Sequence, residues 1–126
     1  MRVLLDSHVA LWWLADDDDL GANARDRIEQ AEQAFVSVVT PWELGIKRAL
    51  GKLTMPDDLV AQLRSGGFEM LAISTDHAER APTLPPHHRD PFDRMLIAQA
   101  QTESLTFLSA DGAIAAYEVE HLDARS

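Results

Sequence analysis

Short apolar runs alternate with stretches of helical spacing along the whole chain. Four runs have the composition of buried strands: Val3–Asp6, Phe35–Val39, Met70–Ile73 and Leu105–Leu108. A weaker run at Val119–Leu122 is expected to be an edge strand. Because helical stretches separate the strands, the pattern predicts an α/β domain with a mostly parallel sheet and helices on both faces.

The segments between the runs carry helix start and stop signals. Thr40-Pro41-Trp42-Glu43 has the order of a capping box, with Thr40 as N-cap and proline at the first helical position. Asp90-Pro91-Phe92-Asp93 repeats that order before a later helix, and Ser7 is expected to cap the first one. Helices are therefore predicted at about 7–14, 22–31, 40–50, 56–65, 75–81, 91–100 and 111–116.

Composition narrows the classes of function. With 126 residues, the chain is expected to be one domain, 1–126, with a core of its own. The absence of cysteine excludes disulfides, thiolate zinc sites and a cysteine nucleophile. No apolar stretch is long enough to cross a bilayer, and an acid at position 6 comes too early for a signal peptide. We therefore expect a cytoplasmic protein with no membrane partner.

The charge is strongly negative, at −10, with 21 acids against 11 bases. Taken alone, this balance argues against a nucleic-acid binder, which usually has a basic face. The objection weakens if metal ions offset part of the charge, or if a basic partner covers the acidic surface. Part of the excess is the run Asp16–Asp19, which we interpret as a solvated turn.

Four acids fall where a strand is expected to end or the next helix to begin: Asp6, Glu43, Asp93 and Asp111. In a parallel sheet such positions meet at the carboxyl edge, where ligands bind. Two carboxylates about 5 Å apart, at an effective dielectric near 20, repel by roughly 3 kcal/mol. Four would offset much of a domain's usual stability of roughly 5–15 kcal/mol. The set therefore predicts a hard divalent cation, Mg²⁺ or Mn²⁺, used to hydrolyse a phosphodiester.

Each acid also has a structural explanation. Glu43 and Asp93 stand where helix starts favour acids, and Asp111 could cap a short helix of its own. Asp6 is harder to explain, because a carboxylate that closes a buried strand is costly unless it is paired or metal-bound. For each acid by itself the structural explanation is favoured. For the four acids together metal binding is favoured.

Other polar and aromatic residues are weaker candidates. His87 and His88 lie in a proline-rich loop and are expected to be inert, and His8 is expected to pack. Trp42 and Phe92 each precede a key acid and could stack on a base, but core packing is favoured.

The few bases close to these acids in sequence have two interpretations of equal weight. They could contact substrate phosphates or pair with neighbouring acids. The bases are Lys47, Arg48, Lys52, Arg89 and Arg94.

Several blocks together resemble the PIN domain, specifically the VapC-type ribonuclease toxins of type II toxin–antitoxin pairs. The blocks are Leu4–Leu14, Ser37–Glu43, His88–Ala100, which is the most specific, and Leu108–Asp111. The likeness spans almost the whole chain in the expected order. It implies a single-domain α/β/α sandwich.

The resemblance places the family's four acids on Asp6, Glu43, Asp93 and Asp111. We keep Asp90 as a candidate helper because it is close to Asp93 in sequence. It implies an endoribonuclease that needs Mg²⁺ or Mn²⁺, forms a homodimer and is silenced by a cognate antitoxin. An antitoxin tail that places a basic side chain in the acidic groove would account for a nuclease of such negative charge. Asp6 and Asp93 would hold the ion, Glu43 would orient or deprotonate the attacking water, and Asp111 would complete the site.

Three alternatives remain from the residues. A phosphoacceptor receiver domain needs a late lysine, and none follows Lys52. A PIN-like protein-binding module without nuclease activity is disfavoured by the intact set of four acids. A nuclease acting on DNA is set aside only by the resemblance. The apolar run Trp12–Leu14 is compatible with a dimer surface.

Overall fold

Five parallel strands form one sheet in the computed structural model, which describes residues 1–126. Their spatial order is β3-β2-β1-β4-β5. The strands are β1 (Arg2–Leu5), β2 (Gln33–Ser37), β3 (Glu69–Leu71), β4 (Thr106–Ser109) and β5 (His121–Asp123). The predicted α/β class and parallel sheet are confirmed.

Strand β1 lies at the point where the strand order reverses. From β1 the chain builds β2 and β3 outward on one side, and then returns to build β4 and β5 on the other. Leu4 of β1 is paired with Phe35 of β2 and with Phe107 of β4. In open parallel sheets, ligands bind in the crevice beyond the carboxyl ends of the strands at such a reversal. The residues that follow β1 and β4 therefore occupy the expected ligand position.

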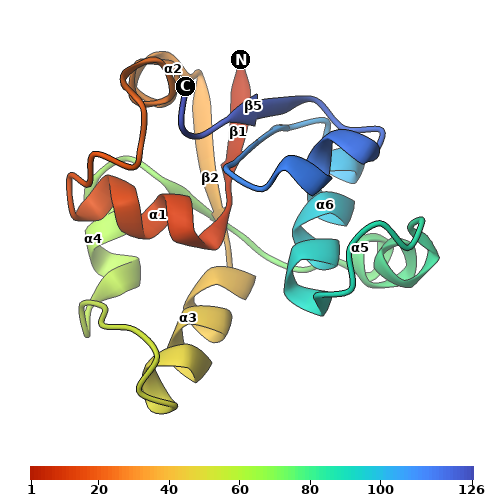
Figure 1. Ribbon diagram of the computed structural model, residues 1–126, viewed down its shortest axis with the longest axis horizontal. Helices are drawn as coiled ribbons and strands as arrows, with labels where there is room; N and C mark the ends of the chain where they lie inside the picture. The colour runs from red at the N-terminus through yellow and green to blue at the C-terminus, as the bar shows by residue number, and fades with distance from the viewer.

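Helices cover both faces of the sheet (Figure 1). In the view of Figure 1, α1, α2 and α4 lie on one side, α5 and α6 on the other, and α3 lies beyond the lower ends of the strands. Two short 3-10 turns, η1 (Ala81–Thr83) and η2 (Gly112–Ala116), complete the chain. The helices are α1 (Ser7–Leu14), α2 (Ala22–Gln30), α3 (Val39–Ala49), α4 (Leu59–Ser65), α5 (Thr75–Arg80) and α6 (Pro91–Glu103).

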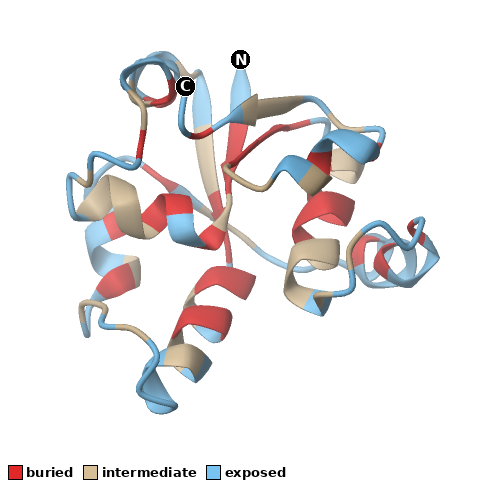
Figure 2. Cartoon of the chain, in the orientation of Figure 1, coloured by how far each residue is buried: buried red, intermediate tan, exposed pale blue.

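Two apolar cores lie on opposite faces of the sheet. Val3 and Leu5 of β1 belong to the core that α1, α2 and α4 cover, whereas Leu4 belongs to the core under α6. This alternation follows from the two-residue period of a strand. It explains why β1, β2 and β4 are apolar on both faces, as the buried centre of a parallel sheet requires (Figure 2).

The predicted N-cap of α3 is wrong by two residues, because Val38 and not Thr40 precedes the helix, and the predicted capping box is therefore absent. Strand β2 ends at Ser37, α3 begins at Val39, and Thr40 is fully buried inside the first turn. Pro41 is tolerated there because the first backbone N–H groups of a helix have no intrahelical acceptor. The capping predicted for Asp90 is confirmed, since its carboxylate accepts from the Phe92 N–H at 2.8 Å.

The main exposed apolar surface lies on α3 and not on α1. Trp12, Trp13 and Leu14 are partly buried against the first core and are not among the exposed large apolar side chains. On α3, Trp42 is 60% exposed, and Ile46 and Leu50 follow at four-residue intervals at 40% and 64%. None of the helices has the length and apolar character needed to span a bilayer.

Candidate active site

A pocket of about 260 Å³ at the carboxyl edge of the sheet brings the four predicted acids together. Asp6 follows β1, Asp111 lies two residues after β4, Glu43 projects from α3, and Asp93 projects from the first turn of α6. The pocket is also lined by Asp90, His8, Val9, Trp12, Lys47, Ala110 and Arg125. Side chains separated by as many as 119 positions, from Asp6 to Arg125, thus share one small volume.

Asp6 is fixed by the ends of the two central strands. Its Oδ1 accepts a hydrogen bond from the Ser7 N–H at 2.7 Å, and its Oδ2 accepts one from the Ser109 hydroxyl at 2.8 Å. Asp6 is therefore the N-cap of α1, the role that the sequence assigned to Ser7. Burial raises the pKa of Asp6, the two hydrogen bonds oppose that rise, and the negative charge of Glu43 adds to it.

Glu43 is buried, and each of its carboxylate oxygens accepts a hydrogen bond. Its Oε1 accepts from the Ser7 hydroxyl at 2.8 Å, and its Oε2 accepts from the Lys47 ammonium at 2.8 Å. The Ser7 hydroxyl also lies 3.0 Å from the Thr40 hydroxyl, which ties α1 to α3. The hydrogen bond to Glu43 raises the pKa of Lys47, so the Lys47 ammonium stays charged at neutral pH.

Asp93 also has a strongly perturbed acid–base equilibrium. Burial is the largest cause, the negative charges of Asp6, Asp90 and Glu43 add to it, and His88 opposes it. Together these effects raise the pKa of Asp93 to about 7 from an ordinary value of 3.8. Without an added cation, the pocket therefore retains a proton near neutral pH.

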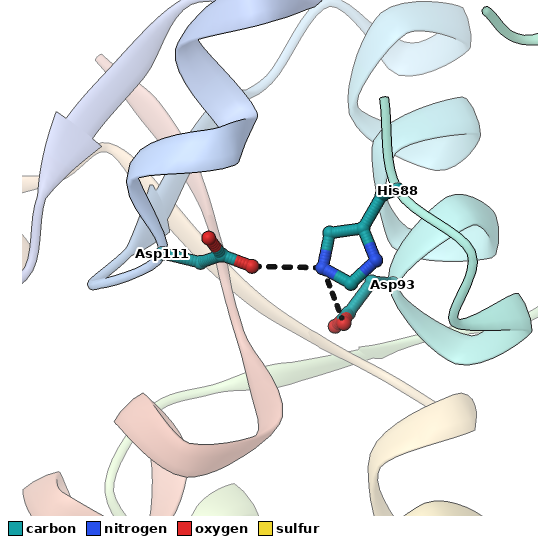
Figure 3. Close-up of side chains that lie close together, drawn as sticks. All are labelled: His88, Asp93 and Asp111. Carbon is teal, nitrogen blue, oxygen red and sulfur yellow. Dashed lines mark hydrogen bonds and ion pairs between the residues drawn. The ribbon is translucent and has the colours of Figure 1, made fainter. Parts of the chain in front are cut away.

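His88 joins Asp93 to Asp111, contrary to the prediction that it is an inert loop residue. Its Nε2 lies 2.8 Å from Asp111 Oδ2 and 3.0 Å from Asp93 Oδ2 (Figure 3). Its Nδ1 accepts a hydrogen bond from the Asp90 N–H at 3.2 Å, which favours the tautomer with the proton on Nε2. His88 thus donates to the two carboxylates. The sequence signal was its place two residues before the N-cap of α6.

Asp111 both lines the pocket and caps η2. Its Oδ1 accepts from the Ala113 N–H at 2.9 Å. That hydrogen bond is the main reason why the pKa of Asp111 is lowered, and the hydrogen bond and charge of His88 lower it further. The structural and functional explanations offered for this acid are therefore compatible. Asp111 contributes a carboxylate that is ionised when its neighbour Asp93 is only partly so.

The neighbouring bases divide between several roles. The guanidinium of Arg94 donates to backbone carbonyls of the loop before α6, including those of Leu84 at 2.8 Å and Ala81 at 3.0 Å. The ion pair predicted as one role for Arg94 is absent, and its guanidinium instead holds the loop that carries His88. Ion pairing is correct for Lys47, and for Arg48, which pairs with Asp57 at 3.0 Å.

Three further expectations have mixed outcomes. Phe92 packs against the second core as predicted, and the Trp42 ring meets it edge to face with centroids 4.9 Å apart. Trp42 itself is exposed, so core packing is wrong for that residue. His8 is exposed at the pocket and does not pack, whereas exposed His87 lies against Tyr117.

Arg125 is a pocket residue that sequence reasoning missed. It follows the last strand and enters the pocket beside Trp12, with its guanidinium 5.1 Å from the centre of the indole ring. No local motif marks it. Its position depends on the parallel pairing of β5 with β4, which a single sequence does not specify.

The chain is thus an all-parallel α/β domain with a carboxylate-lined pocket at the point where the strand order reverses. The PIN domain family model matches residues 3–120, and this chain belongs to that family. In sequence it is similar to "Ribonuclease VapC22" of Mycobacterium tuberculosis (strain ATCC 25618 / H37Rv), with 34% identity over 106 residues and 78% of each chain covered.

Solved toxin–antitoxin structures share the fold. VapBC2 from Rickettsia felis, bound to a promoter DNA fragment, aligns with a TM-score of 0.71 at 12% identity over 98% of each chain. DNA-bound VapBC from Salmonella typhimurium gives 0.70 at 15% identity, again over 98% of each chain. VapBC-5 from Mycobacterium tuberculosis gives 0.63 at 20% identity, over 97% of this chain and 98% of that one. The predicted α/β/α architecture is confirmed.

Proposed function

We propose that this protein is a metal-dependent endoribonuclease and the toxin component of a toxin–antitoxin pair, acting in the cytoplasm. The observation that carries the proposal is the convergence of Asp6, Glu43, Asp93 and Asp111 on one pocket at the strand reversal. Membership of the PIN family and similarity to a named ribonuclease support RNA hydrolysis over other uses of an acidic pocket.

The pocket fits a hard divalent cation. The pKa values of Asp6 and Asp93 are raised, so ionisation of these two acids is disfavoured, and a cation between them would remove that cost. Carboxylate oxygens are ligands that Mg²⁺ and Mn²⁺ prefer. The ligand atoms of His88, Asp93 and Asp111 lie within 4.8 Å of one another. Because His88 Nε2 carries a proton in the favoured tautomer, we assign the binding to carboxylates and give His88 a positioning role.

The side chains have distinct proposed roles. Asp6 and Asp93 would hold the cation directly, and Asp111 would complete the site directly or through water. When bound, the cation would lower the pKa of water and offset the negative charge of the phosphate. Glu43, held in one orientation by Ser7 and Lys47, would orient or deprotonate the attacking water. In-line attack by water leaves a 5′-phosphate and a 3′-hydroxyl.

The partners follow from the same proposal. We propose that a cognate antitoxin silences the enzyme by covering the pocket with a basic segment, which suits a chain of net charge −10. We also propose a homodimer that uses the apolar surface of α3 made of Trp42, Ile46 and Leu50. The alternative is a PIN-like binding module without nuclease activity, which would need the α3 surface but not the acids.

The test is cleavage of total RNA with Mn²⁺ and with a chelator, followed by mapping of the new ends. We expect Mn²⁺-dependent cuts that carry 5′-phosphates, and their loss in Asp6→Asn. Asp18→Asn is the matched control, because it removes the same charge from an exposed turn. Cleavage by Asp6→Asn at the parental rate would contradict the site assignment. Intact RNA with every variant would favour the binding module.

A further inference from the structure

We propose that Arg125 binds a phosphate of the RNA strand next to the one that is cleaved, and so positions the substrate over the acidic pocket. The inference rests on the proposed nuclease function and adds to it a residue that binds substrate without taking part in the chemistry. Arg125 lies outside residues 3–120, the part of the chain that the family model matches.

The backbone around Arg125 is fixed from two sides. The N–H of Ala124 donates to the Ser109 carbonyl at 3.0 Å, and the Ala124 carbonyl accepts from the Gly21 N–H at 2.8 Å. The Ser126 carbonyl accepts from the Asn23 N–H at 3.0 Å, and Ala124 is fully buried. Arg125 therefore projects from a rigid segment that joins β4 to the start of α2.

The Arg125 side chain is oriented but not neutralised. Its guanidinium lies over Trp12, a residue that also lines the pocket, at 5.1 Å from the ring centre. Its ionic neighbour is Asp19, at a loose 3.7 Å, and both side chains are more than half exposed. An exposed contact of that length contributes little and exchanges readily. The donors of the guanidinium fork are thus available to a ligand.

The other bases of this region already have partners. Lys47 is paired with buried Glu43 at 2.8 Å, and Arg94 donates to loop carbonyls. A polyanion that approaches four acids needs a cation close to the pocket, and Arg125 lines the pocket while keeping its donors free. Arginine suits a phosphate because its planar fork matches two phosphate oxygens.

The test is RNA binding by fluorescence anisotropy, with Asp6→Asn as the parent so that the RNA stays intact. The probes are two fluorescein-labelled single-stranded RNAs of different mixed sequence, in Mg²⁺, over a range of salt concentrations. The second substitution is Arg125→Gln, with Arg125→Lys as the conservative variant. Arg27→Gln is the matched control, because it removes the same charge from an exposed part of α2. Equal melting temperatures establish that the variants are folded.

We expect Arg125→Gln to weaken binding of both RNAs by about tenfold and to reduce the slope of log K against log salt by about 0.7, as the loss of one phosphate contact predicts. Arg125→Lys should restore part of the affinity, and Arg27→Gln should match the parent. If Arg125→Gln binds RNA like Arg27→Gln while the unmutated chain cleaves RNA, this inference alone is wrong. If the unmutated chain neither binds nor cleaves RNA, both this inference and the proposed function are wrong.

Discussion

The hydroxyl of Ser7 donates a 2.8 Å hydrogen bond to Glu43 Oε1, which links the first residue of α1 to the acid of α3 across 36 positions. Both side chains are buried. A buried carboxylate is tolerated when its oxygens have donors, and Ser7 and Lys47 supply one to each oxygen of Glu43. Ser7 is therefore part of the site, not a helix cap.

Ser7→Ala tests this link. Loss of the hydroxyl leaves Oε1 of Glu43 short of a donor in a buried position, so we expect a fall of about 1–3 kcal/mol in the free energy of unfolding. Urea denaturation measures this free energy, and Ser65→Ala is the control because Ser65 is an exposed residue of α4. A change in Ser7→Ala no larger than in Ser65→Ala would show that the hydrogen bond does not support Glu43.

The raised pKa of Asp93 predicts how stability depends on pH in the presence of a chelator. Between about pH 4 and pH 7 the folded state binds more protons at Asp93 than the unfolded state does, because the folded pKa is about 7 and the ordinary value 3.8. The free energy of unfolding should therefore fall as pH rises through that window, by at most about 1.4 kcal/mol per pH unit, and level off above it. Asp6, whose pKa is also raised, acts in the same direction.

Urea denaturation in a chelating buffer from about pH 5 to about pH 8 measures this slope. Asp93→Asn should flatten it and raise stability at the upper end, and exposed Asp57→Asn should leave it unchanged. Saturating Mn²⁺ should stabilise the unmutated chain most above about pH 7, where the carboxylates are ionised. If the free energy of unfolding of Asp93→Asn depends on pH as steeply as that of the unmutated chain, Asp93 is not the source of the pH dependence.

Gly21 is a packing constraint next to Arg125. A Cβ atom built on Gly21 would lie 2.3 Å from the Ser126 backbone, so Gly21→Ala must displace the segment that carries Arg125. We expect a loss of about 1–3 kcal/mol in the free energy of unfolding. Gly45→Ala is the control. It lies within α3 with no atom within 4 Å of the new Cβ, and should gain about 0.5–1 kcal/mol. Equal effects of the two changes would contradict the account.

The apolar surface of α3 predicts the state of association. The chain of 14.0 kDa should sediment at about twice that mass, and Ile46→Asp should return it to the monomer because a charge is desolvated in the contact. Ile73→Asp is matched in residue type and exposure but lies away from α3. Dissociation by Ile73→Asp and not by Ile46→Asp would place the contact elsewhere.

The sequence is informative wherever short-range pattern determines the structure. The central strands are continuous apolar runs, and the cap of α6 is set by residues within three positions of Asp90. The convergence of the four acids could be predicted because each follows a strand or begins a helix, and parallel pairing brings those positions to one edge.

The remainder depends on tertiary contacts. Thr40 has the sequence context of an N-cap, but it lies inside α3 because its hydroxyl meets that of Ser7. His88 has the context of an exposed loop, but Arg94 and Tyr117 hold that loop against the pocket. Arg125 reaches the site only through the pairing of β5 with β4. Apart from Arg94, which is six residues from His88, none of these partners is close in sequence.

The most direct test of the central claim is anomalous diffraction at the manganese edge from a crystal soaked in Mn²⁺. We predict an anomalous peak inside the pocket, bounded by the carboxylates of Asp6 and Asp93, and its absence from Asp6→Asn crystals. Fully occupied Mn²⁺ elsewhere on the chain with none among these carboxylates, or an unchanged peak in Asp6→Asn, would contradict the account.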